Sequence, residues 1–539
     1  MKKEKIFFWI ITFLTVGFVF AITFSGIINH AISDLDELWN FNSAKQIAAG
    51  LLPYKEISMI TTPLTPWVGA VFLNIIGANV FGFRILTAII VSVIALVTMV
   101  VCKELTGKKF FAFVTTMILT SMFLINYRLD YNVTTIILVL IILLAELKLK
   151  KKCESETNFK IPLWVNHLLI GFVSGLAILN KQTLGLFVAL AVIITPLIFF
   201  KKENKKEIFK SILFRVLGMI IPVAVFITYL LATNTFQDFI DYAILGIKSF
   251  NNSIAYSLLI EKGEGGINVL AILVPVIEVL TLLVILVGRH SRKKGKASAL
   301  DNEEFNKLQI LFMYSLPMLI VMYPIADKIH FLIGTYIASI LMMYELYISI
   351  NIIIKNKKAR AKYLIYIVIF IGLMVYPLYS NIVYLRDNYT EYDKEIKTSI
   401  KYYENTIMNE TIERRVHDLK KFAEEQQNRG YKIYIVDSEA AAAEIPLDIY
   451  NKNYSMFLKG NIGKDGEEGI IKEIESSEKC IYLIKNSRYS QNWQNPTEVT
   501  NYIKNNLYIV DSVNIYDCYV TKAENYYKEA KWTQSKIIR

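Results

Sequence analysis

Residues 82–102 read GFRILTAIIVSVIALVTMVVC and are followed at once by Lys103. Arg84 is the only charged residue within this run. An α-helix rises 1.5 Å per residue, so about 20 apolar residues cross the roughly 30 Å hydrocarbon core of a bilayer. The stretch therefore predicts a transmembrane helix.

Comparable runs recur along the chain and set its class. The 539 residues are 54% hydrophobic, with a mean hydropathy of +0.40, which is high for a soluble protein. Runs long enough to span a bilayer lie at 6–28, 82–102, 110–126, 131–147, 163–180, 183–200, 212–233, 267–288, 308–325, 331–354 and 362–384. The sequence thus predicts a polytopic α-helical membrane protein with about 11 transmembrane helices. The run 6–28 resembles a signal peptide, but its length favours a retained anchor.

The basic residues between the runs predict the orientation. Lysine and arginine cluster in every second connection, which is the positive-inside pattern. The clusters begin at Lys103, Lys148, Lys201, Arg289 and Lys355. We therefore expect a protein of the plasma membrane whose N-terminus lies in the cytoplasm. Everything after about residue 385 is then outside the cell. The apolar residues 67–80 fit only as a helix in the outer interface.

The same pattern explains the net charge of +12. Topology accounts for the excess of basic residues, so we expect membrane lipids and no nucleic acid as partners.

The residues after 384 form a different kind of sequence. Residues 391–428 are charged, with apolar residues at helical spacing. Short apolar runs then alternate with helix-like stretches, which predicts strands at 431–436, 480–484, 507–510 and 515–520 and helices at 440–450, 467–476 and 497–505. We therefore predict two domains, a transmembrane module at 1–384 and a C-terminal extracytoplasmic α/β domain at 385–539. A disulfide between Cys480 and Cys518 is compatible with the outer location.

The first outer loop carries several acids directly after a membrane span. Asp34, Asp36 and Glu37 follow the first run, and Glu56 follows a Pro-Tyr pair. Carboxylates beside a low-dielectric boundary are costly unless they are used or paired. They are either functional groups or ordinary solvated loop charges, with Ser33 and Asp34 capping a helix.

The order of features in this loop resembles that of the GT-C superfamily of membrane glycosyltransferases, which includes protein O-mannosyltransferases and bacterial aminoarabinose transferases. Asp36-Glu37 matches the acidic pair of that family, and Gly50-Leu-Leu-Pro53-Tyr54 matches its turn. Phe81-Gly82, followed by Arg84, resembles the start of its next helix. The family often has Asp soon after the Pro-Tyr, whereas this chain has Lys55 and Glu56.

Two further stretches carry the resemblance, which extends over about residues 1–355. Gly171 to Gln182 resembles a helix end of these enzymes with Lys181 at its tip. Tyr323-Pro324-Ile-Ala-Asp327-Lys-Ile-His330 resembles a Pro-x-x-Asp-x-x-His element of bacterial members. The resemblance implies a GT-C-like catalytic module with interfacial helices in its outer loop 30–81.

The implied activity is transfer of a sugar from a polyprenyl-phosphate donor to an acceptor in the cell envelope, with inversion. Such a reaction needs a base for the acceptor hydroxyl and cations for the departing phosphate. We predict Asp36 as the general base, with Glu37 beside it as a catalytic residue. The predicted donor-phosphate and substrate residues are Lys181, Arg128, Asp130, Asp327, His330 and Glu56. The acceptor is a lipid, a glycan or a protein on the outer face.

We expect no metal and no other cofactor. Asp34-Leu-Asp36 has the Asp-x-Asp spacing that binds a metal-nucleotide in other glycosyltransferases, so a divalent metal is possible, but it is not favoured for so short a match. The sequence contains no Cys-x-x-Cys pair and no Walker loop.

Plainer interpretations stay open. Lys181 is also compatible with a lysine that snorkels to the interface, Arg128 and Asp130 with a local ion pair, and His330 with a loop hydrogen bond. Glu278 and Glu345 fall inside predicted spans, and this favours the alternative of a transporter or lipid flippase. A scaffold for envelope assembly is the third possibility. The loop 234–266 is predicted to hold a helix over the outer surface that borders the donor groove.

Overall fold

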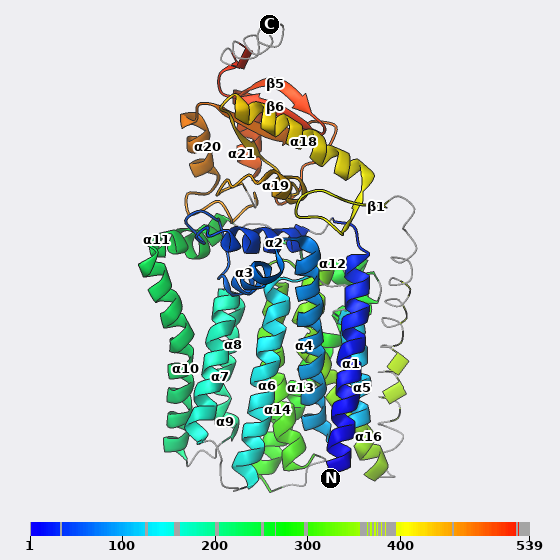
Figure 1. Cartoon of the computed structure of the whole chain (residues 1–539). Coiled ribbons are helices and arrows are strands. Elements are labelled where there is room, and N and C mark those ends of the chain that lie inside the picture. The colour runs from blue at the N-terminus through cyan, green and yellow to red at the C-terminus, as the bar shows by residue number, and fades with distance from the viewer. Residues whose placement is uncertain are drawn as a thin grey trace. The chain divides into compact units, whose positions relative to one another are not determined.

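The structure is a computed structural model that describes residues 2–32, 35–123, 128–155, 162–199, 204–249, 253–264, 266–295, 300–355, 395–454, 457–523 and 526–527, with isolated positions between 364 and 383. Within these ranges, 8 helices are long and apolar enough to cross a membrane. They are α1 (Lys2–Ile28), α4 (Val80–Thr106), α6 (Tyr131–Ser155), α7 (Leu163–Asn180), α10 (Lys205–Ala232), α13 (Ile267–Lys293), α14 (Asn302–Met318) and α16 (Tyr336–Lys355) (Figure 1).

The remaining predicted spans have shorter counterparts. The run 110–126 corresponds to α5 (Lys109–Phe123), and the run 183–200 to α8 (Gln182–Ile194) with α9 (Pro196–Phe199). The interfacial segment 67–80 corresponds to α3 (Leu64–Ile76), whose 13 residues would extend only about 20 Å as a helix. The predicted span 362–384 lies largely outside the described residues.

The chain forms two compact units. The first contains residues 1–27, 85–226 and 253–391, and the second contains residues 28–84, 227–252 and 392–539. The outer loop 30–81 thus belongs with residues of the C-terminal domain. The predicted boundary at 384–385 falls among residues that the structure does not describe, and the two-domain division stays a prediction.

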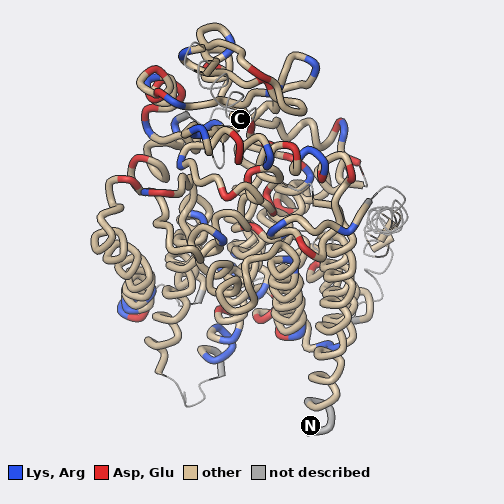
Figure 2. Tube along the Cα trace, turned by 45° about the horizontal axis from the view of Figure 1, so that its top comes forward, with Lys and Arg blue, Asp and Glu red and all other residues tan. Residues whose placement is uncertain are grey.

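In the first unit, several basic helix ends gather at one end of the bundle. Lys151 of α6 binds Glu104 of α4 at 3.2 Å. Lys307 Nζ, near the start of α14, donates to the Leu105 carbonyl at 2.8 Å. Lys103 lies 3.7 Å from the ring centroid of Phe8, near the start of α1. Figure 2 shows basic residues at this lower end of the helices.

A buried polar cluster joins four helices of the same unit. Arg215 of α10 makes two hydrogen bonds to Glu146 of α6, at 2.6 and 2.8 Å. Its Nε donates to His167 of α7 at 3.1 Å, and Tyr314 of α14 donates to Glu146 at 2.7 Å. Arg215 and Glu146 are both fully buried. An isolated charge within a bilayer costs free energy. The pairing of Arg215 with Glu146 offsets that cost, so both residues can lie within membrane-spanning helices.

Glycine allows α7 and α10 to approach closely. A Cβ atom on Gly171 would lie 2.0 Å from the carbonyl oxygen of Arg215, and one on Gly218 would lie 2.1 Å from that of Leu168. Small residues at such positions let membrane helices pack backbone against backbone.

In the second unit, a four-stranded sheet forms the centre of the α/β domain. Its strands are β3 (Lys432–Ile435), β4 (Cys480–Lys485), β5 (Tyr508–Val513) and β6 (Tyr516–Val520), in the order β3-β4-β6-β5. β3 and β4 are parallel, and β6 is antiparallel to β4 and β5. All four strands were predicted, and the fold class is confirmed.

Helices cover both faces of this sheet. One face packs against α18 (Glu410–Asn428), through Leu419 and Phe422. The other packs against α20 (Gly466–Ser476) and α21 (Thr497–Asn506), through Ile470, Ile474 and Ile503. α19 (Ala441–Leu447) follows β3. The three helices predicted between the strands, 440–450, 467–476 and 497–505, correspond to α19, α20 and α21.

The helical spacing of apolar residues in 391–428 corresponds to a helix only in its second half. The described part of this stretch begins with an antiparallel pair of short strands, β1 (Glu395–Lys397) and β2 (Ile407–Asn409), and helix α18 starts only at Glu410. Tyr402 and Asn405 have positive φ angles of 71° and 67°, which a right-handed helix excludes. Cys480 and Cys518 are buried and free, so the possible disulfide is not formed.

Candidate functional site

The predicted acidic pair opens helix α2 (Leu35–Ala48). Glu37 is fully buried and binds Arg84, near the start of α4, through two hydrogen bonds of 2.9 and 2.8 Å. Arg84 also donates to the His30 carbonyl at 2.8 Å. This forked geometry fixes the start of α2 against the start of α4. Glu37 is thus engaged on both carboxylate oxygens.

Asp36 differs from its neighbour in exposure. Its side chain is half-buried, while Glu37 is fully buried. It lies in the first turn of α2, where the helix dipole favours a negative charge. The Asp36 carbonyl accepts a hydrogen bond from Asn40 at 2.8 Å. Asp36 is therefore a partly accessible carboxylate on a helix that the Glu37–Arg84 pair holds in place.

The predicted turn after α2 is present. Gly50 and Tyr54 have φ angles of 93° and 68°, and the Tyr54 amide donates to the Ile57 carbonyl at 2.8 Å. Tyr54 is fully buried, and its hydroxyl donates to the Thr61 carbonyl at 2.9 Å. Glu56 is exposed and accepts a hydrogen bond of 2.7 Å from the Leu52 amide. Its carboxylate therefore closes the turn.

In the first unit, residues before α6 meet the tip between α7 and α8. Asp130 caps α6 by accepting from the Val133 amide at 2.8 Å and from Asn132 at 3.1 Å. Lys181 Nζ in turn donates to Asn132 Oδ1 at 3.0 Å and lies 5.0 Å from the ring centroid of Tyr131. The structure thus joins two predicted residues, Asp130 and Lys181, through Asn132, which the sequence did not single out.

Arg128 and Lys181 differ in burial. Arg128 is 6% exposed, whereas Lys181 is partly exposed. Both cations lie near the start of α6, and paired cations of this kind commonly bind a phosphate. Asn126 and Tyr127, which precede Arg128, lie outside the described residues.

Asp327 and His330 form a compact unit at the start of α15 (Lys328–Gly334). Asp327 Oδ1 accepts from the His330 amide and pairs with His330 Nδ1, both at 2.8 Å. Burial raises the pKa of Asp327, but the hydrogen bonds and charge of His330 outweigh it and hold that pKa below its usual value. Asp327 is therefore an ionised cap that orients the imidazole.

These five residues of the first unit lie at one end of its bundle. The C-terminal end of α6 lies with the basic helix ends, so its start, near Asp130, lies at the opposite end. Tyr347, late in α16, donates to the Thr106 carbonyl at the basic end, so α15, which precedes α16, also lies opposite. The structure thus brings Arg128, Asp130, Lys181, Asp327 and His330 to the end away from the basic clusters.

The loop 234–266 contains α11 (Phe236–Phe239), a π-helical turn (Ile240–Leu245) and α12 (Ser257–Lys262) rather than one long helix. Asp238 and Asp241 bind Lys452 and Lys464, at 3.1 and 3.2 Å. The first half of this loop therefore packs on the C-terminal α/β domain, a role that the sequence did not predict.

Helix α2 is also bound to the α/β domain, through Lys45. Lys45 is 3% exposed, binds Asp448 at 3.1 Å and donates to the Ile445 carbonyl at 3.1 Å. Burial lowers the pKa of Lys45, and Asp448 acts in the opposite direction. The helix that carries Asp36 is thus fixed at one end by Arg84 and at the other by α19.

No group of three or more His, Cys, Asp or Glu side chains suited to a metal ion occurs among the described residues. Asp34, the first residue of the Asp-x-Asp spacing, is not among them.

Comparisons with known proteins agree on the class. Residues 61–232 match the family model described as dolichyl-phosphate-mannose-protein mannosyltransferase. Crystal structures of ArnT from Cupriavidus metallidurans, bound to undecaprenyl phosphate and in the apo state, share the fold at a TM-score of 0.51, with 13% and 12% identity. Each alignment covers 96% of this chain and 98% of ArnT. No curated protein matches the sequence significantly.

A crystal structure of the Archaeoglobus fulgidus oligosaccharyltransferase, tethered with an acceptor peptide, also matches, at a TM-score of 0.47 and 9% identity over 81% of this chain and 63% of that one. This match is too distant to bear on the site. The family match and the ArnT fold confirm the predicted resemblance to the GT-C superfamily of membrane glycosyltransferases. The chain is a multi-pass membrane protein with the fold of ArnT.

Proposed function

We propose that the protein transfers a sugar from a polyprenyl-phosphate donor to an acceptor on the outer face of the plasma membrane, with inversion. Two findings support this donor class. An ArnT structure of the same fold holds undecaprenyl phosphate, and the matching family is named for dolichyl-phosphate-mannose. The shared chemistry of both is a long-chain polyprenyl phosphate.

The observation that carries the proposal is the placement of Asp36. Its carboxylate is partly exposed at the start of a helix that Glu37 and Arg84 hold rigidly. A general base must be ionised and accessible, and its position must be fixed to within a fraction of an ångström. In the proposed step, Asp36 takes the proton of the acceptor hydroxyl. The hydroxyl oxygen attacks the anomeric carbon, and the bond from that carbon to the phosphate oxygen breaks with the electron pair leaving on polyprenyl phosphate.

Cations stabilise that leaving group in the proposal. Lys181 is partly exposed and is oriented by Asn132 and Tyr131, as a phosphate ligand must be. Arg128 and His330 are the other predicted contacts with the donor phosphate. Asp130 and Asp327 orient these groups through the helix caps and through His330.

The two other acids of the first outer loop have supporting roles. Glu37 positions Asp36 through Arg84, and Glu56 shapes the turn by binding the Leu52 amide. The basic helix ends support a cytoplasmic N-terminus by the positive-inside rule, with the α/β domain outside.

The test is transfer by the purified protein in proteoliposomes, with envelope extract as acceptor. The donors are radiolabelled sugars on polyprenyl monophosphate, on polyprenyl diphosphate and on a nucleotide. The proposal expects label in acceptor from a monophosphate donor only, with release of polyprenyl phosphate in equal amount. Transfer from a nucleotide sugar alone would refute the donor class. Movement of labelled lipid across the bilayer without transfer would favour the flippase alternative, for which the buried Glu278 and the partly buried Glu345 would be the groups to examine.

A further inference from the structure

The carboxyl ends of β3 and β4 meet at one edge of the sheet in the α/β domain. The two strands are parallel neighbours, and β6 runs antiparallel on the far side of β4. Residues 436–440 follow β3, and residues 486–496 follow β4. In open α/β sheets, ligands bind outside the carboxyl ends of the parallel strands. The side chains of these two loops therefore indicate what the domain binds.

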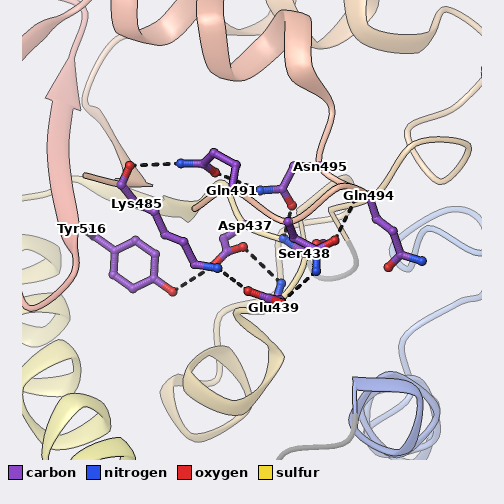
Figure 3. A network of polar contacts seen from close by, with 9 residues as sticks. Asp437, Ser438, Glu439, Lys485, Gln491, Gln494, Asn495 and Tyr516 are labelled. Atoms are coloured by element: carbon purple, nitrogen blue, oxygen red, sulfur yellow. Dashed lines mark hydrogen bonds and ion pairs between the residues drawn. The ribbon is translucent and has the colours of Figure 1, made fainter. Parts of the chain in front are cut away.

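Buried charges fix the base of both loops (Figure 3). Lys485, at the end of β4, binds Asp437 at 3.2 Å and pairs with Glu439. The Tyr516 hydroxyl donates to Asp437 at 3.1 Å. Asp437 and Lys485 are 2% and 6% exposed, while the Glu439 side chain is 49% exposed. These contacts hold the starts of the two loops together and leave the Glu439 carboxylate at the surface.

Planar amides continue from this base into the second loop. Gln491 donates to the Lys485 carbonyl at 3.0 Å, and Asn495 donates to Gln491 at 3.0 Å. Asn495 also accepts from the Ser438 amide, and Asn492 donates to Glu439, both at 2.8 Å. Gln491 and Asn492 are partly exposed. Each side-chain amide offers two N–H donors and one carbonyl acceptor in the same plane.

Two aromatic side chains project from the same ordered loop. Trp493 is 48% exposed and Tyr489 is 42% exposed. The guanidinium of Arg415 lies 6.0 Å from the ring centroid of Tyr489 and orients it. Nearby, the Ser438 hydroxyl is buried and has no hydrogen-bond partner in the described part of the protein.

A pyranose ring matches this combination. Its apolar C–H face packs on an aromatic ring, and its hydroxyl groups both donate and accept, as amides and carboxylates do. A lipid tail would need an apolar groove instead. The partly exposed carboxylate of Glu439 can accept hydrogen bonds from hydroxyl groups, which a neutral glycan supplies.

We propose that the loop 486–495, together with Glu439, is a carbohydrate-binding site that holds a neutral acceptor glycan. This inference rests on the proposed function, because it assigns the acceptor class of that same reaction. α19 connects the two regions, since it begins just after Glu439 and its end binds Lys45 of α2, the helix that carries Asp36.

The test is binding to the full-length protein in lipid nanodiscs without donor. The probes are an array of neutral and acidic oligosaccharides, with a pool of unglycosylated peptides alongside. The variant is Tyr489→Ala/Trp493→Ala. The matched control is Tyr508→Ala, because Tyr508 is an aromatic of the same sheet that is still more exposed, at 59%, and it lies at the start of β5, paired with Val520, away from the loop 486–495.

The wild type and the control are expected to bind neutral oligosaccharides, and the double variant is expected to bind them about tenfold or more weakly, because aromatic anchors carry a large share of binding free energy. Absence of glycan binding, or equal binding by all variants, would overturn the inference. Peptide binding with the same dependence on Trp493 would assign the surface to a protein acceptor instead. Because no donor is present, glycan binding is measured without any sugar transfer, so a failure of sugar transfer and a failure of glycan binding are separate results.

Discussion

Removal of one partner of the Glu37–Arg84 pair is expected to destabilise the protein strongly. Both side chains are fully buried, and two hydrogen bonds of 2.9 and 2.8 Å join them. In Glu37→Ala, the guanidinium stays buried without its carboxylate, which costs about 3–5 kcal/mol. At about 2–4 °C per kcal/mol for a unit of this size, the melting temperature falls by roughly 6–20 °C.

The double variant Glu37→Leu/Arg84→Met separates the pair from the individual residues. With neither charge present, no unpaired charge stays buried, so the melting temperature is expected to return to within a few degrees of the wild type. Thermal unfolding of the detergent-solubilised protein, followed by fluorescence-detected size exclusion, measures both effects. The reasoning is refuted if the double variant is as unstable as Glu37→Ala, or if the single variant melts like the wild type.

The same variants test the role of Glu37. If Glu37 acts by holding α2, a stable double variant keeps measurable transfer with the pH profile of the wild type. If Glu37 is itself catalytic, as the sequence predicted, the double variant is inactive although it is folded.

Two further predictions concern other charged groups. Burial, followed by the charge of Asp437, raises the pKa of Glu444 well above its usual 4.5, while Lys45 acts in the opposite direction. The folded protein therefore binds a proton that the unfolded chain releases, and this contribution to stability is lost as the pH rises above about 4.5. Glu444→Gln is expected to melt higher than the wild type at pH 8 and equally at pH 4; a constant difference at both would contradict the assignment. Lys181→Met is expected to lower kcat/KM for the sugar donor by about 10²–10³-fold, because it removes a group that stabilises the charge of the leaving phosphate. The control Lys55→Met, at an exposed lysine, is expected to transfer at the wild-type rate. Equal rates for the two variants in the transfer assay would remove Lys181 from the site.

Hydropathy predicts most of the membrane helices because crossing a bilayer imposes a length and a composition on each segment separately. It cannot predict the Arg215–Glu146 pair, since partners 69 positions apart meet only through the packing of α6 and α10. A charged residue inside each run was the available signal.

The candidate site shows the same division. The order of motifs predicted Asp36, the turn at Gly50 and Tyr54, and the tip at Lys181. It did not predict that Arg84 engages Glu37 or that Asn132 joins Asp130 to Lys181, because those contacts depend on side-chain geometry. In 391–428, apolar spacing alone was misleading, since Ile396 and Ile407 lie on paired strands and positive φ angles interrupt any helix.

The most direct test of the central claim is the transfer rate of Asp36→Asn beside Glu56→Gln, with both variants shown to melt like the wild type. Loss of a general base is expected to slow transfer by about 10²–10⁴-fold in Asp36→Asn. Glu56→Gln is expected to transfer at nearly the wild-type rate, because its amide oxygen can still accept from the Leu52 amide. Wild-type transfer by folded Asp36→Asn would contradict the account.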